Sequence, residues 1–187
     1  MILYLRDAAG NRKKLEFNCT RAQVLGRGGA GVIYVHTKNA QEALKVYHHH
    51  FLAAHTQLQG KIEAMLRLAP GDGEIRDPSG KMYVQIAWPK ALLEDNNGRL
   101  FGYTMPRVDT GQSVMLEQLL QKKERQLEKL REDYQFRVYV ARNLSGAISK
   151  IHEKGHGLVD LKPINILVYR ESGYVCLLDC DGYDVQG

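Results

Sequence analysis

One short segment, residues 157–165, constrains the chain more than any other part of the sequence. It reads Gly-Leu-Val-Asp-Leu-Lys-Pro-Ile-Asn and carries an acid, a lysine and an amide, Asp160, Lys162 and Asn165, on one loop. An apolar run follows, and a second apolar run ends at Asp179. Phosphoryl transfer uses such groups: the acid accepts a hydroxyl proton, the lysine offsets charge on the moving phosphoryl group, and the amide oxygen holds a metal ion. The segment is therefore a candidate catalytic loop followed by a β-hairpin.

A glycine-rich segment lies in the first part of the chain. Within residues 24–35, Gly26, Gly28 and Gly31 match the pattern GxGxxG. The match alone is weak, and an ordinary glycine-rich hairpin turn would also produce it. Apolar β-forming residues stand on both sides and predict strand–loop–strand, whereas a dinucleotide-binding fold needs a helix directly after the loop. Glycine leaves the backbone N–H groups open to a phosphate because no Cβ intervenes.

A lysine stands in the middle of the next predicted strand, residues 42–47. Alternation with a period of two places Lys45 on one face with Ala43 and Tyr47. A lysine buried in such a strand is costly unless it is paired, although many strand lysines are simply exposed. The spacing of apolar residues predicts a helix over about 53–68, with Glu63 beside its apolar stripe. We expect Glu63 to pair with Lys45, rather than to be an ordinary exposed glutamate.

The remaining patterns predict a mixed α+β chain. Residues 1–18 are typical of a β-hairpin with a turn at Asp7–Asn11. We expect His48, His49 and His50 to form a solvated turn rather than a metal site, because three consecutive histidines cannot all face one ion. Further strands and helices are predicted over 82–88, 101–105, 113–133 (a charged helix) and 134–153 (a helix with a buried stripe).

Composition and charge further limit the class of protein to which this chain can belong and the ligands that it can bind. Hydrophobic residues make up 44% of the chain, and no apolar run approaches the ~18 residues that span a bilayer, so we expect a folded protein with no membrane partner. Residues 1–50 carry eight basic and three acidic residues, which accounts for the net charge of +5. This basic part suits a polyphosphate ligand, weak nucleic-acid contact or a solvated face. Three cysteines without a CxxC pair favour reduced thiols and a cytoplasmic location.

In their order along the chain, these motifs resemble those of protein kinases. The series runs from the glycine loop through Lys45 and Glu63 to the loop 157–165, which is similar to H-R-D-L-K-x-x-N, and ends at Asp179, where kinases have D-F-G. The chain departs from this pattern at several positions: Leu158 and Val159 replace His and Arg, and Asp181 replaces the glycine of D-F-G.

The resemblance implies a Ser/Thr-type protein kinase that uses ATP and Mg²⁺. It assigns catalysis to Asp160, Lys162, Lys45 and Glu63, and the metal to Asn165 and Asp179, with Asp181 as a further carboxylate. Met105 takes the gatekeeper position, and the Pro106 carbonyl and Val108 N–H face the adenine. The nucleotide contacts that it implies are Leu25, Gly26, Gly28, Gly29, Gly31, Ile33, Ala43, Lys45, Met105, Pro106, Val108 and Leu167.

The resemblance also implies two lobes. Residues 1–108 would form an antiparallel β N-lobe with one helix and the N-terminal hairpin, and residues 109–187 would form part of a mainly helical C-lobe. Kinases continue beyond D-F-G with an activation segment and an A-P-E motif, so we expect this part of the C-lobe to be incomplete and prone to self-association. Three pieces of the sequence resemble bacterial kinase domains that are joined to helix-hairpin-helix DNA-binding modules: the glycine loop Gly26–Gly29 with Lys45–His48, Ile86–Pro89 and Gly102–Pro106. No such module is in the sequence, and nucleic acid would bind only through one.

Three other functional interpretations are compatible with the sequence. A nucleotide-binding scaffold with little transfer would keep the same motifs, and so would a small-molecule kinase. The run Asp179-Cys180-Asp181-Gly182 also mimics the D-x-D-G of haloacid-dehalogenase phosphatases. In that fold the motif follows the first strand, whereas here only five residues of the sequence follow it. The protein substrate is not encoded in any of these motifs.

Overall fold

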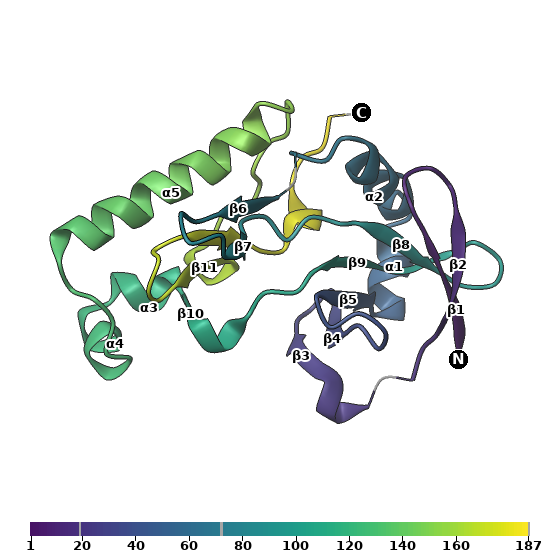
Figure 1. Ribbon diagram of the computed structural model, residues 1–187. Coiled ribbons are helices and arrows are strands. Elements are labelled where there is room, and N and C mark those ends of the chain that lie inside the picture. Colours follow the sequence, from purple (N-terminus) through teal and green to yellow (C-terminus); the bar gives the residue numbers. More distant parts are fainter. Residues whose placement is uncertain (19, 72, 187) are drawn as a thin grey trace. The chain divides into compact units, whose positions relative to one another are not determined.

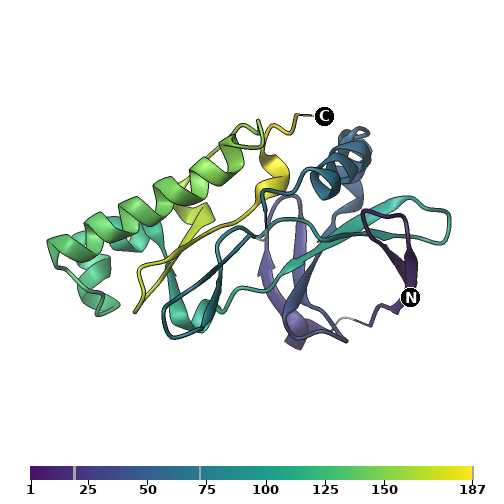
Figure 2. The same ribbon diagram turned by 45° about the horizontal axis from the view of Figure 1, so that its top comes forward.

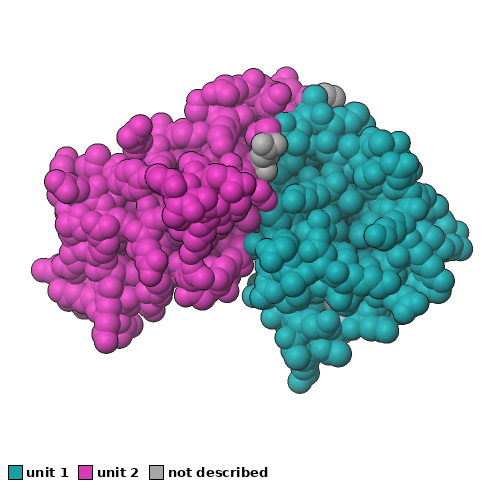
Figure 3. All heavy atoms as spheres, in the orientation of Figure 1, with its two compact units in different colours: residues 1–69, 88–107, 187 teal, residues 70–87, 108–186 magenta. Residues whose placement is uncertain are grey.

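The computed structural model describes residues 1–18, 20–71 and 73–186, which fall into two compact units. Unit 1 comprises Met1–Ala69 and Trp88–Arg107, and unit 2 comprises Pro70–Ala87 and Val108–Gln186 (Figure 3). The chain passes from one unit to the other next to the expected lobe boundary at residue 108. Pro70–Ala87, however, groups with unit 2 although the sequence analysis placed it in the first lobe.

Unit 1 is built on one antiparallel seven-stranded sheet with the strand order β2-β1-β8-β9-β5-β4-β3 (Figure 1). Its strands are β1 (Ile2–Arg6), β2 (Arg12–Glu16), β3 (Val24–Arg27), β4 (Gly31–Val35), β5 (Glu42–Tyr47), β8 (Ala91–Glu94) and β9 (Leu100–Pro106). Its helices are α1 (His49–Ala54) and α2 (Leu58–Arg67). The predicted helix over 53–68 is therefore divided, because the chain leaves helical geometry around His55.

The N-terminal hairpin forms where the sequence predicts it. Asp7 closes the turn by accepting hydrogen bonds from the backbone of Ala9 and Asn11, and Gly10 has a φ of 86°, which favours glycine. β1 also pairs with β8, so the hairpin adds two strands to the edge of the sheet. Leucines fill the core on one face of this sheet: Leu3, Leu15, Leu44 and Leu93.

Helix α2 packs against β8 (Figures 1 and 2). Its residues Ile62 and Met65 are fully buried, as the apolar spacing requires. The indole Nε1 of Trp88 donates a hydrogen bond to the Met65 carbonyl over 2.8 Å. Glu63 follows Ile62 on this anchored helix, so its backbone position is set by the packing of its neighbours.

Unit 2 combines short strands with one long helix. Its strands are β6 (Glu74–Arg76), β7 (Met82–Val84), β10 (Ser113–Met115), β11 (Ile166–Tyr169) and β12 (Val175–Leu177), and its helices are α3 (Leu116–Leu120), α4 (Lys122–Leu127) and α5 (Tyr134–His152). The strands form a β10-β11-β12 sheet and a β6-β7 pair. Asp133 caps α5 by accepting from the Phe136 N–H, and the helix packs on β12 through an apolar face that includes Phe136 and Ile151.

Two predicted elements of unit 2 were wrong. The charged helix over 113–133 is instead β10 followed by two short helices, because Gln121 is extended and the Arg125 guanidinium binds the carbonyls of Leu119 and Leu120. The predicted strand over 82–88 ends at Val84; beyond it, Ile86 forms a single parallel bridge with Leu177. Within the described ranges, no helix is both long and apolar enough to cross a membrane.

Candidate functional site

The glycine loop joins β3 to β4 as the strand–loop–strand pattern predicts. The Gly28 N–H donates to the Gly31 carbonyl over 2.9 Å, and His48 ties the loop to the end of β5 through its N–H to Ala30 O. A Cβ added at Gly26, Gly28 or Gly29 would meet no heavy atom within 4 Å, so these residues face open space. Gly31 differs, because its Cβ would lie 2.2 Å from the Val46 carbonyl oxygen. A side chain at position 31 would clash with the backbone of β5, so the sheet requires glycine there.

Lys45 lies in the middle of β5 and is only 5% exposed. It is opposite Ile33 on β4 and opposite Tyr103 on β9, while Ala43 is opposite Met105. Directly opposed residues of antiparallel strands project to the same face. Gly31, Ile33, Ala43, Lys45 and Met105, which the sequence analysis assigned to one nucleotide, therefore share one face of the sheet.

The surroundings of Lys45 are aromatic as well as apolar. Its ammonium lies 5.6 Å from the ring centroid of Tyr47 and 5.8 Å from that of Tyr103. Cations are attracted to the faces of aromatic rings at such distances. Pro106, the predicted hinge residue, ends β9 opposite Glu42. The Lys45 ammonium therefore lies beside two tyrosine rings, one from β5 and one from β9.

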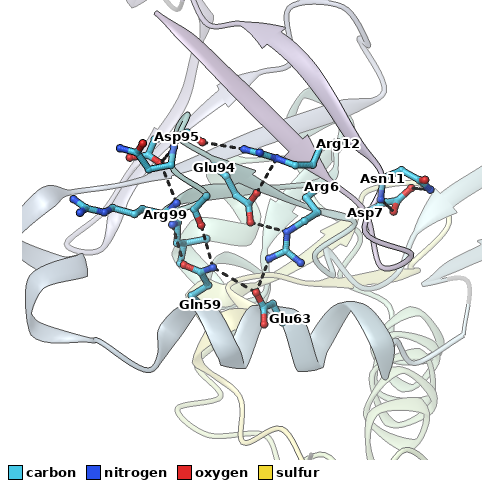
Figure 4. A network of polar contacts seen from close by, with 12 residues as sticks. Arg6, Asp7, Asn11, Arg12, Gln59, Glu63, Glu94, Asp95 and Arg99 are labelled. Carbon is cyan, nitrogen blue, oxygen red and sulfur yellow. Dashed lines mark hydrogen bonds and ion pairs between the residues drawn. The ribbon is translucent and has the colours of Figure 1, made fainter.

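Glu63 contacts a cation that the sequence analysis did not consider. Its Oε1 accepts hydrogen bonds from Arg6 Nη2 over 2.5 Å and from Gln59 Nε2 over 3.4 Å (Figure 4). The hydrogen bond from Arg6 is the main cause that holds the pKa of Glu63 below its ordinary value. Arg6 also donates from Nε to Glu94 Oε1 over 2.7 Å. No local motif marks Arg6, because this contact joins positions 57 residues apart.

In unit 2, the candidate catalytic loop carries Asp160 in the left-handed region, with a φ of 60°. Aspartate tolerates this conformation better than most residues, and such geometry is common at functional sites. Lys162 Nζ donates to Asp160 Oδ2 over 2.7 Å. The start of the loop is fixed by two backbone hydrogen bonds between Gly157 and Asp184.

Asn165 and Asp179 lie at the same end of the β11–β12 pair. Ile166 is opposite Leu177, and the Leu178 N–H donates to the Asn165 carbonyl over 2.8 Å. Asp179 follows directly, with a φ of 57°. Leu167 is buried in β11, and Asp181 is 7% exposed in the short 3-10 turn after Asp179.

The residues at this strand end suit Mg²⁺ rather than a transition metal. Amide and carboxylate oxygens are the ligands that Mg²⁺ prefers, and it is commonly held by one or two carboxylates together with substrate phosphates. Among the described residues, no three His, Cys, Asp or Glu side chains gather as a metal-binding group. In the glycine loop of unit 1, no atom lies where a Cβ would stand at Gly28 or Gly29, so the backbone there is open to the approach of a phosphate.

Comparisons with known proteins agree with the fold. No family model matches the chain. It is 27% identical over 168 residues to protein kinase YegI of Escherichia coli O157:H7 and of Escherichia coli strain K12. This alignment covers 89% of the chain but only 24% of the relatives, so the chain spans about a quarter of their length. A crystal structure of Rad53 residues 1–466 in complex with AMP-PNP matches with a TM-score of 0.53 and 18% identity, covering 84% of this chain and 37% of that one.

The architecture is therefore mixed α+β, with a large antiparallel sheet in unit 1 like that of a kinase N-lobe, as the sequence analysis predicted. The relatives and the fold together support a protein kinase-like family for this chain.

Proposed function

We propose that the chain is an ATP- and Mg²⁺-dependent protein kinase domain of the Ser/Thr type. It would transfer the γ-phosphoryl group of ATP to a hydroxyl group of a protein. The observation that carries this proposal is the shared sheet face of Gly31, Ile33, Ala43, Lys45 and Met105. The position of Asn165 beside the end of β12, next to Asp179, supports it independently.

In unit 1, the proposed roles are binding and orientation. The apolar side chains of Leu25, Ile33 and Ala43 would pack against the adenine, and the Met105–Pro106 strand end would supply its polar contacts. Gly28 and Gly29 would let backbone N–H groups approach the phosphates, since no Cβ stands in the way. The Lys45 ammonium would bind phosphate oxygens, with Glu63 as its partner.

In unit 2, the proposed roles are proton transfer and metal binding. The Asp160 carboxylate would accept the proton of the attacking hydroxyl group. Lys162 would then leave Asp160 and offset negative charge on the phosphoryl oxygens. Asn165 and Asp179 would hold Mg²⁺, which neutralises charge on the phosphates when it is bound. Asp181 would act through its neighbour Asp179, because it is largely buried.

The direct test measures nucleotide binding and phosphoryl transfer with Lys45→Met. ATP binding is titrated with and without Mg²⁺, and transfer is followed with radiolabelled ATP and general protein substrates. We expect Lys45→Met to weaken Mg-ATP binding and to abolish transfer while the fold is kept. Lys38→Met is the matched control, because Lys38 is an exposed lysine on the loop before the same strand. Equal binding and transfer by Lys45→Met and the unchanged protein would contradict the proposal.

The same assay distinguishes the proposed protein kinase from the alternative functions. A nucleotide-binding scaffold would bind Mg-ATP without any transfer to protein. A small-molecule kinase would consume ATP only after a low-molecular-weight extract supplies the acceptor. We propose the cytoplasmic location from the cysteines, of which Cys176 and Cys180 are buried thiols.

A further inference from the structure

Arg6, Leu92, Tyr103 and Lys45 form one row across the sheet of unit 1. Arg6 is opposite Leu92, Leu92 is opposite Tyr103, and Tyr103 is opposite Lys45. Their side chains therefore project to the same face. Leu92 and Tyr103 in the middle of the row are fully buried, and a cation stands at each end. Three strand spacings separate β1 from β5, which is about 14 Å.

The Arg6 end of the row is rigidly anchored. Its Nε donates to Glu94, whose side chain is 2% exposed and also lies 3.5 Å from Arg12 Nε. A carboxylate buried this deeply must keep a cation, because an unpaired buried charge is strongly destabilising. The guanidinium is planar, so the anchored Nε also fixes where Nη2 points. In this structure Nη2 points at Glu63 (Figure 4).

Helix α2 is held toward the same end of the row. Gln59, one turn before Glu63, donates to the Gly98 carbonyl in the β8–β9 connection and accepts from the Leu100 N–H at the start of β9. The same side chain also donates to Glu63 Oε1. The glutamate thus receives hydrogen bonds from two groups that are fixed to the β1–β8–β9 side of the sheet.

We propose that Arg6 is a positioning residue that competes with Lys45 for Glu63. This inference rests on the proposed function, in which Glu63 is the partner of Lys45. The two cations stand at opposite ends of one row, and Glu63, which Arg6 binds in this structure, is the carboxylate that the proposed function assigns to Lys45. While Arg6 holds Glu63, the lysine is not oriented by it, and the N-terminal hairpin thereby lowers the affinity of the site for Mg-ATP. Release of Glu63 from Arg6 lets it pair with Lys45.

The test compares two double variants of the 187-residue chain. Arg6→Gln with Glu94→Gln removes the cation at Glu63 and also the buried charge that Arg6 neutralises, so the fold is not left with an unpaired carboxylate. Arg12→Gln with Glu94→Gln is the matched control, because it removes an arginine of the same hairpin and the same buried charge. It keeps Arg6 at Glu63, since the amide oxygen at position 94 can still accept from Arg6 Nε. Circular dichroism and urea unfolding establish that both are folded.

We expect the Arg6 double variant to bind Mg-ATP about two to five times more tightly than the unchanged chain, which lies within the usual contribution of an exposed ion pair. The Arg12 double variant should bind like the unchanged chain. Adding Glu63→Gln to the Arg6 variant should remove the gain, which a general structural effect of the hairpin would not do.

Each alternative result is decisive. Equal or weaker binding by the Arg6 double variant overturns the competition while leaving the proposed function intact. A gain that persists with Glu63→Gln also overturns it, because Glu63 is then not the carrier of the effect. Absence of Mg-ATP binding by every protein, the unchanged chain included, refutes the proposed function and the inference that depends on it.

Discussion

The ammonium of Lys162 donates a hydrogen bond to a carboxylate oxygen of Asp160 over 2.7 Å, and both side chains are more than half exposed. Exposed ion pairs contribute little to stability because water and salt screen them. The pair therefore has no substantial structural role, although it occupies the centre of the proposed catalytic loop. A substitution at Asp160 should therefore affect phosphoryl transfer without affecting the stability of the fold.

Asp160→Asn should leave the fold and Mg-ATP binding unchanged but lower phosphoryl transfer by at least about 100-fold, the usual contribution of a general base. The melting temperature should change by less than about 2 °C, since the lost pair is exposed. Glu132→Gln, an exposed acid elsewhere in unit 2, is the control and should transfer normally. Retained transfer by Asp160→Asn would show that another group accepts the proton.

The second prediction concerns the metal. Asp179→Asn should abolish the tightening of ATP binding by Mg²⁺, because Asp179 adjoins Asn165 at the strand end. Asp181→Asn should reduce the tightening less, since the Asp181 side chain is largely buried. Isothermal titration of ATP with and without Mg²⁺ measures both effects. The opposite ranking would mean that the metal-binding position has been assigned two residues too early.

The glycines of the sheet provide a third prediction with an internal control. Gly29→Ala should keep the fold, because its Cβ meets no atom within 4 Å, but it should weaken Mg-ATP binding where the loop approaches the phosphates. Gly31→Ala should instead destabilise unit 1, because its Cβ would lie 2.2 Å from a backbone carbonyl oxygen. Urea unfolding and nucleotide titration of the two variants separate these roles. Unaltered nucleotide binding by a folded Gly29→Ala protein would exclude phosphate contact at this loop position.

Local sequence patterns correctly predicted those helices and strands whose signal lies entirely within their own residues. The turn chemistry at Asp7 gave the hairpin, alternation around Lys45 gave β5, and the apolar spacing from Phe136 to Ile151 gave α5. The same rules failed for residues 113–133, whose helix-favouring composition is interrupted where Arg125 binds the carbonyls of Leu119 and Leu120. Such side-chain contacts with the backbone depend on the folded geometry and have no periodicity.

The candidate site, too, was predictable only where local sequence patterns determine it. The face shared by Ala43 and Lys45 follows from strand alternation, and the order of the motifs indicated which residues to place around it. The contact between Arg6 and Glu63 did not follow, because it requires that β1 pair with β8 in one particular register. A single sequence specifies the hairpin but not the strand that it joins.

The last prediction uses the pH dependence of stability at Glu63. The hydrogen bond from Arg6 lowers the pKa of Glu63 in the folded protein below its ordinary value of 4.5. A group whose pKa is depressed on folding contributes stability above its unfolded pKa, and this contribution is lost as the pH falls through the folded pKa. We therefore expect Glu63→Gln to lower the urea midpoint at pH 7, and to lower it progressively less as the pH falls below about 4.5. The comparison runs from pH 7 to the acid limit of folding, with Glu132→Gln as the exposed control. A midpoint difference between Glu63→Gln and the unchanged chain that is constant with pH would mean that the Glu63 carboxylate is not held by Arg6 in solution.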